Sequence, residues 1–73
     1  MKKVYFRFYE ELNDFLPEEK KKVIFVHNFI DKASVKDMIG SLGVPHNEVD
    51  LILVNGNSVD FSYIVEDKDM ISV

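Results

Sequence analysis

The N-terminal segment alternates between strongly apolar positions and others. In residues 3–9 one phase holds Val4, Phe6 and Phe8. The opposite phase holds Tyr5, Arg7 and Tyr9. Because successive side chains of a strand point to opposite sides of a sheet, the pattern predicts a strand with one apolar face.

The alternation ends at residue 10. Residues 10–22 are mostly polar, apart from the pair Phe15-Leu16 and the following Pro17, which cannot donate to a strand ladder. We therefore predict a long hairpin loop held to the core by Phe15 and Leu16. Residues 23–29 are rich in β-branched and aromatic side chains and predict a second strand. Both phases of this strand are apolar, so the pattern leaves open which phase faces the core.

One amphipathic helix follows. Ser34 is a suitable N-cap, and Asp37 lies three positions later, where a capping-box acid would stand. Apolar residues then recur with the spacing of one helix face, at Val35, Met38, Ile39 and Leu42. Gly43 and Pro45 provide the stop signal.

The C-terminal third reads as short strands joined by turns. Residues 49–54 predict a nearly continuous apolar strand, and Asn55-Gly56-Asn57 predicts a turn because Asn and Gly tolerate positive φ. A brief return strand around Val59, an irregular segment over residues 60–65 and an acidic turn over residues 66–69 follow. Residues 70–73 predict the last strand.

These elements favour an α+β fold in a single domain spanning residues 1–73. A mixed sheet of four to five strands would be covered on one face by the helix. In such a β-grasp arrangement the last strand pairs parallel to the first and lies between the first and the third. A ferredoxin-like sandwich needs two helices, and the sequence predicts one.

Composition and charge exclude several classes of protein. The 73 residues include no cysteine, which rules out disulfides, thiolate zinc sites and thiol nucleophiles. The longest apolar run, residues 51–54, is far shorter than the roughly 20 residues that span a bilayer, and no signal peptide is seen. We therefore expect a cytoplasmic protein without a membrane partner.

The net charge of −4 opposes direct binding to nucleic acid, because it repels a phosphate backbone. Lys20-Lys21-Lys22 could suggest a basic patch, but Glu18 and Glu19 precede these lysines directly. A solvated loop is the better interpretation.

Several stretches together resemble the ubiquitin-like domain found ahead of Mut7-C ribonuclease domains, a relative of the bacterial sulfur carriers of thiamine and molybdopterin synthesis. They are residues 7–9, 12–17, 34–37, 43–46, 48–56 and 59–63. The resemblance covers nearly the whole chain. It implies a ubiquitin-like β-grasp fold and a non-catalytic protein-interaction or scaffold module, with a PIN-like Mut7-C nuclease as partner, in cis or in trans, in bacterial-type RNA processing.

The first alternative is a sulfur-carrier-like homologue. Such carriers need a C-terminal Gly-Gly, whereas the three glycines here are Gly40, Gly43 and Gly56, and residues 70–73 form a strand pattern. The second alternative is a weak RNA-binding accessory domain, because Tyr5, Arg7 and Tyr9 could stack on bases.

We predict neither an enzyme nor a cofactor or metal site. His27 and His46 fall on different elements without a nucleophile pattern around them. The acidic residues Asp60, Glu66, Asp67 and Asp69 lack the loop spacing of a calcium site and are interpreted as a solvated turn. Ser34 is better explained as a helix cap than as a nucleophile.

The candidate functional site is the sheet face turned away from the helix. If Phe25 and Phe29 take the core side of the second strand, the outer face gathers two tyrosines, two aliphatic residues, a methionine and one arginine. We predict a docking surface for a protein partner formed by Tyr5, Arg7, Tyr9, Ile24, Val26 and Met70. The alternative is that Ile24 and Val26 belong to the core and the outer face is half-polar.

Overall fold

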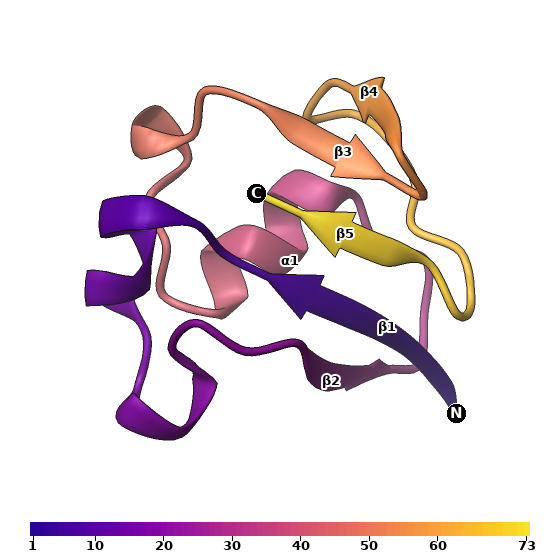
Figure 1. Ribbon diagram of the computed structural model, residues 1–73. Coiled ribbons are helices and arrows are strands. Elements are labelled where there is room, and N and C mark those ends of the chain that lie inside the picture. Colours follow the sequence, from indigo (N-terminus) through magenta and orange to yellow (C-terminus); the bar gives the residue numbers. More distant parts are fainter.

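The computed structural model describes all residues, 1–73, as one five-stranded sheet backed by one α-helix (Figure 1). In chain order the strands are β1 (Lys2–Arg7), β2 (Phe25–Phe29), β3 (Ile52–Val54), β4 (Asn57–Val59) and β5 (Met70–Ser72). The helices are α1 (Val35–Ser41) and three 3₁₀ helices, η1 (Glu10–Phe15), η2 (Glu18–Lys20) and η3 (His46–Glu48).

The strand order in the sheet is β2-β1-β5-β3-β4. β5 pairs parallel to β1, with Tyr5 opposite Met70, and antiparallel to β3 on its other side. The two hairpins, β1–β2 and β3–β4, are antiparallel. This is the mixed α+β arrangement of a β-grasp fold predicted from the sequence, with the last strand between the first and the third.

The core lies between the helix and the inner phase of the sheet. Phe6 and Phe8 are fully buried, and their rings stack with centroids 5.6 Å apart. Ile71 lies opposite Phe6 on β5, and Val35 and Ile39 pack onto this layer from α1. The predicted helix stripe is confirmed, except that Leu42 is half-buried rather than buried.

Both ends of α1 follow from its flanking residues. The Oγ of Ser34 accepts a hydrogen bond from the N–H of Asp37 at 3.2 Å, which confirms the N-cap. At the other end Gly43 has a φ of +92°, and the N–H of Val44 donates to the C=O of Ile39. The N–H of Gly43 donates to the C=O of Gly40, and the two bonds form a Schellman motif, in which the left-handed residue is normally glycine.

The strand predicted over residues 49–54 is shorter than expected. Only Ile52–Val54 forms a strand, because β4 and β5 supply partners for these residues alone. Residues 46–48, just before the predicted strand, form η3. The turn that follows is confirmed: Asn55 and Gly56 have φ values of 51° and 86°, as a two-residue type I′ hairpin turn requires.

The prediction that Phe15 pins the long hairpin loop is wrong. Leu12 and Leu16 are buried, whereas Phe15 is 41% exposed. Leu16 leaves η1 in an extended conformation, so it and its neighbour Phe15 point to different sides of the chain. The loop contains the 3₁₀ helices η1 and η2.

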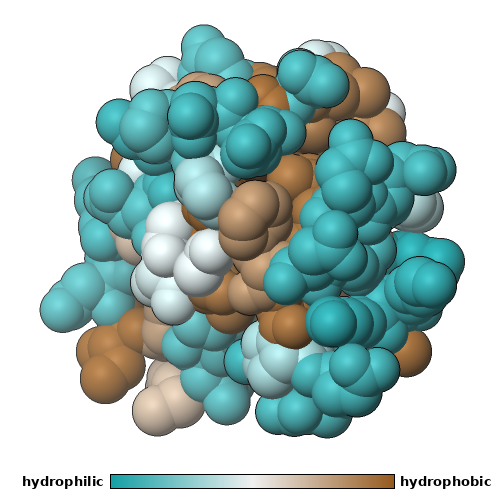
Figure 2. Space-filling model, turned by 90° about the vertical axis from the view of Figure 1, so that its left-hand side faces the viewer, coloured by the Kyte–Doolittle hydropathy of each residue, from teal (hydrophilic) through white to brown (hydrophobic).

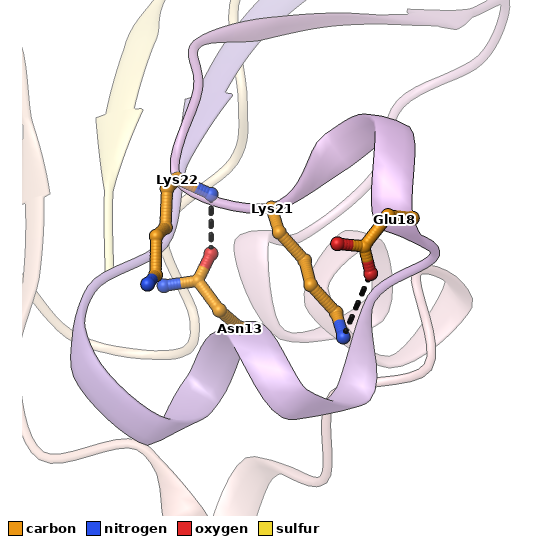
Figure 3. A network of polar contacts seen from close by, with 4 residues as sticks. All are labelled: Asn13, Glu18, Lys21 and Lys22. Atoms are coloured by element: carbon orange, nitrogen blue, oxygen red, sulfur yellow. Dashed lines mark hydrogen bonds and ion pairs between the residues drawn. The ribbon is translucent and has the colours of Figure 1, made fainter.

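A buried asparagine holds this loop together. Nδ2 of Asn13 donates to the C=O groups of Phe8 and Glu10 at 3.1 and 3.0 Å. Its Oδ1 accepts a hydrogen bond from the N–H of Lys22 at 2.8 Å (Figure 3). The side chain therefore joins the start of the loop to its end, which backbone bonding alone would leave apart. The nearby Lys21–Glu18 ion pair, at 3.4 Å, is exposed and adds little.

The structure settles the phase of the second strand. Phe25, His27 and Phe29 are half-buried on the inner side, whereas Val26 is exposed. The His27 ring contacts Phe6 edge-on, and burial, with a smaller contribution from Lys20, lowers the pKa of His27. The alternative in which Val26 belongs to the core is therefore excluded.

Candidate functional site

The strand register places the six sequence-predicted residues on one side of the sheet. Tyr5 lies opposite Val26 on β2 and opposite Met70 on β5. Tyr9 follows β1 and Ile24 precedes β2, each in the same phase as its outward neighbours. We call Tyr5, Arg7, Tyr9, Ile24, Val26 and Met70 the outer face.

The outer face combines exposed apolar side chains with one cation. Ile24, Val26 and Tyr9 are each about half exposed, whereas Tyr5 and Met70 are half-buried between them. The guanidinium carbon of Arg7 lies 5.1 Å from the centroid of the Tyr9 ring, within cation–π range. Nε of Arg7 is buried and has no hydrogen-bond partner. The arginine is thus packed onto the sheet without an acidic partner in the chain.

Three further residues extend the outer face, and sequence reasoning missed them. Ser72 lies opposite Arg7 on β5, and Leu53 lies opposite Ser72 on β3. Leu51, two residues before Leu53, is 55% exposed. The sequence showed residues 51–54 as one apolar run, so only the pairing with β5 reveals which of them face outward.

We had expected the acidic turn before β5 to be solvated, but one of its carboxylates is buried. Asp69 is only 6% exposed. Its carboxylate accepts hydrogen bonds from Nδ2 of Asn55, from the hydroxyl of Tyr63 and from the N–H of Glu66, at 2.8–2.9 Å. The backbone N–H of Met70 in turn donates to Oδ1 of Asn55 at 2.9 Å. This network ties the β3–β4 turn and the segment before β5 to the start of the central strand.

The network should make one tyrosine titrate late. The hydrogen bond to Asp69, together with burial and the negative charges of Asp69 and Glu66, raises the pKa of Tyr63 to about 12 from 10.0. Because the pKa of Tyr63 is raised in the folded state, the hydrogen bond of its un-ionised hydroxyl stabilises the fold. That contribution to stability is complete below pH 10 and is lost as the pH rises towards 12. Tyrosinate absorbance recorded during alkaline titrations of the unchanged chain and of Tyr63→Phe should assign to Tyr63 an ionisation with a pKa of about 12. Ionisation of Tyr63 near its ordinary pKa of 10.0 would contradict the network.

The other candidate chemical groups have structural contacts. His46 contacts Phe61 edge-on, as His27 contacts Phe6. The Ser62 hydroxyl and N–H both donate to Asp60, and these bonds lower the pKa of that carboxyl. No group of three or more His, Asp or Glu side chains is placed to hold a metal ion. The only α-helix has seven residues and could not cross a membrane.

Comparisons with known proteins address the family and the fold. The family model described as Mut7-C ubiquitin matches residues 1–73. Among solved structures, a protein from Pyrococcus furiosus assigned as molybdopterin converting factor, subunit 1, superimposes with a TM-score of 0.71 at 17% identity. The match covers 99% of this chain and 94% of that one. A comparison with curated protein sequences gave no significant match.

Proposed function

The chain belongs to the Mut7-C ubiquitin family, and from this premise we propose that it is a non-catalytic protein-interaction module whose partner docks on the outer face. The partner is a Mut7-C, PIN-like ribonuclease domain, joined in the same chain or supplied in trans, and the module serves RNA processing in the cytoplasm. The domain recruits or positions the nuclease and performs no chemistry itself.

The observation that carries this proposal is the row Val26–Tyr5–Met70 across three neighbouring strands. An apolar row on the solvent side of a small sheet contributes little to the core, and such patches commonly mark binding sites. Tyr5 and Tyr9 offer large, stiff contact areas, and Arg7 lies among them with its charge unpaired. Tyrosine and arginine are the residue types in which binding energy concentrates.

A sulfur-carrier-like homologue is the second candidate, and the likeness to the molybdopterin converting factor subunit favours it. That chemistry requires a terminal Gly-Gly carboxylate that is activated and converted to a thiocarboxylate. The sequence contains no adjacent glycines. Intact-mass spectrometry after incubation with ATP and a sulfur-carrier activating enzyme distinguishes the two: a thiocarboxylate mass gain supports the carrier, and an unchanged mass supports the interaction module.

A weak RNA-binding accessory is the third candidate, resting on Tyr5, Arg7 and Tyr9 as a stacking strip. The net charge of −4 opposes it. Titration with a single-stranded RNA oligonucleotide should leave the outer-face resonances unshifted.

The proposal predicts where a Mut7-C nuclease domain binds. On addition of the nuclease domain to the ¹⁵N-labelled chain, amide shifts should concentrate at Tyr5, Arg7, Val26 and Met70. Val26→Glu places a charge in the middle of the patch and should weaken binding by about tenfold or more. Ile64→Glu is the matched control, because Ile64 is 45% exposed against 49% for Val26 and lies outside the five-stranded sheet.

Thermal melts should show both variants folded before binding is compared. Shifts that gather on α1 or in the loop before it, or equal losses in Val26→Glu and Ile64→Glu, would show that the outer face is not the nuclease site.

A further inference from the structure

A small hollow lies beside the end of β1, where β1 and β2 separate. The β1–β2 ladder ends at the pair Phe6–Phe25, and the chain between them forms the long hairpin loop. The hollow has a volume of about 250 Å³. It is lined by Arg7, Phe8, Tyr9, Glu10, Asn13 and Lys22. The side of the molecule that carries the 3₁₀ helices is mostly hydrophilic around a narrow hydrophobic seam (Figure 2).

Two buried hydrogen-bond donors at this hollow have no acceptor in the chain. The N–H groups of Tyr5 and Tyr9 donate to the two residues that flank β5. Phe8, which is out of phase with them, turns its N–H and C=O to the opposite side of β1. There its C=O accepts from Asn13, but its N–H has no partner, although Phe8 is only 1% exposed. Nε of the neighbouring Arg7 is likewise buried and unpaired. Because buried polar groups are nearly always hydrogen-bonded, an acceptor from outside the chain is expected here.

The charges around these donors favour an anionic acceptor. Arg7 and Lys22 both line the hollow, and neither forms an ion pair in the chain. Glu10 is the only acid in the lining, and it pairs with neither cation. A water molecule accepts from the donors but leaves the cations uncompensated, whereas an anion satisfies the donors and the charges together.

The kind of anion follows from the number of charges and donors. Two cations and one acid leave a single excess positive charge, which matches a monoanion better than a phosphate dianion. A carboxylate also has two oxygens, one for a guanidinium and one for a backbone N–H. The lining therefore suits a carboxylate.

We propose that this hollow binds a carboxylate, supplied by an aspartate or glutamate side chain of a protein partner. The carboxylate oxygens accept from the guanidinium of Arg7 and the N–H of Phe8, and Lys22 supplies a second positive charge. The inference rests on the proposed function only for the source of the carboxylate. Arg7 and Tyr9 belong both to the outer face and to the lining, so a partner seated on the outer face reaches the hollow with an acidic side chain.

The test compares two capped tripeptides, Gly-Glu-Gly and Gly-Gln-Gly, titrated into the ¹⁵N-labelled chain at low salt. The glutamate peptide should shift the Phe8 amide and the Arg7 Nε–H resonance, and added salt should weaken its binding. The glutamine peptide, which has the same shape without the charge, should shift neither. Inorganic phosphate is the third probe and should bind no more tightly than the glutamate peptide.

Charge-removing variants locate the binding site. Arg7→Gln should raise the Kd of the glutamate peptide about tenfold, because it removes a charged donor. Lys22→Gln should raise this Kd about threefold. Lys32→Gln is the matched control, because it removes an exposed lysine that lies outside the lining, and it should leave the Kd unchanged. Thermal melts should show all three variants folded.

Four results would overturn the proposal: a Phe8 amide that neither peptide shifts, equal binding of the two peptides, equal effects of Lys22→Gln and Lys32→Gln, or tighter binding of phosphate. The last would point to a nucleic acid as the source of the anion. Failure here is separable from failure of the proposed function. The tripeptide titration reports on Phe8 and contains no nuclease, whereas the nuclease titration also reports on Val26 and Met70, which lie outside the hollow.

Discussion

The Phe6→Ala variant is expected to lose about 3–5 kcal/mol of its free energy of unfolding. Phe6 is fully buried at the centre of the inner sheet layer, where its ring lies 5.6 Å from that of Phe8 and 6.0 Å from that of Phe25. Truncation removes its apolar contacts and leaves a cavity that strands on both sides of β1 can fill only in part. In a 73-residue domain such a loss is a large share of the total stability.

Urea unfolding followed by circular dichroism measures this loss. Phe15→Ala is the matched control, because the same atoms are removed from a side chain that is 41% exposed. It should cost less than about 1 kcal/mol. Similar losses for the two variants would mean that the inner layer is not the core we describe.

The second large effect is expected at Asp69. Asp69→Asn should lower the free energy of unfolding by about 2–4 kcal/mol, because the two carboxylate oxygens accept three hydrogen bonds from donors. An amide keeps one acceptor oxygen and turns an NH₂ group towards a donor on the other side. The exchange also removes the charge that holds the Tyr63 proton, so the pKa of Tyr63 should fall back towards 10.0.

Asp67→Asn is the control for this variant. Asp67 is exposed and accepts one hydrogen bond, from the N–H of Lys3. Its replacement should cost less than about 1 kcal/mol and leave the titration of Tyr63 unchanged. If Asp69→Asn keeps both the stability and the late tyrosine, the buried network does not hold the start of β5.

Local patterns were sufficient for most of the fold. Alternation over residues 3–9 identified the inner face of β1, and Ser34 and Gly43 marked the ends of α1 within a residue. These signals are local: a strand phase, a cap and a left-handed residue are decided by neighbours in the chain.

The sequence left questions open, or misled, where distant residues decide the outcome. Both phases of residues 23–29 are apolar, and only pairing with β1 shows that Phe25 faces inward and Val26 outward. The sequence around Asp69 is that of an ordinary acidic turn. The burial of Asp69 depends on Asn55 and Tyr63, which come from other segments. The outer face could be predicted on β1 and at Met70 of β5, and on β2 only as one of two alternatives, whereas Leu51 and Leu53 could not be added without the β3–β5 register.

The parallel pairing of β1 with β5 has a consequence for synthesis of the protein. The central strand is the last part of the domain to be translated, and it separates β1 from β3. While the ribosome is still making residues 1–69, the emerging chain can form the β1–β2 hairpin and α1, but one side of Phe6 lacks its neighbour Ile71. The sheet can close only after Val73 has passed the exit tunnel. Until then the nascent chain exposes an aromatic surface, a vulnerable interval in which chaperone binding would protect it from aggregation.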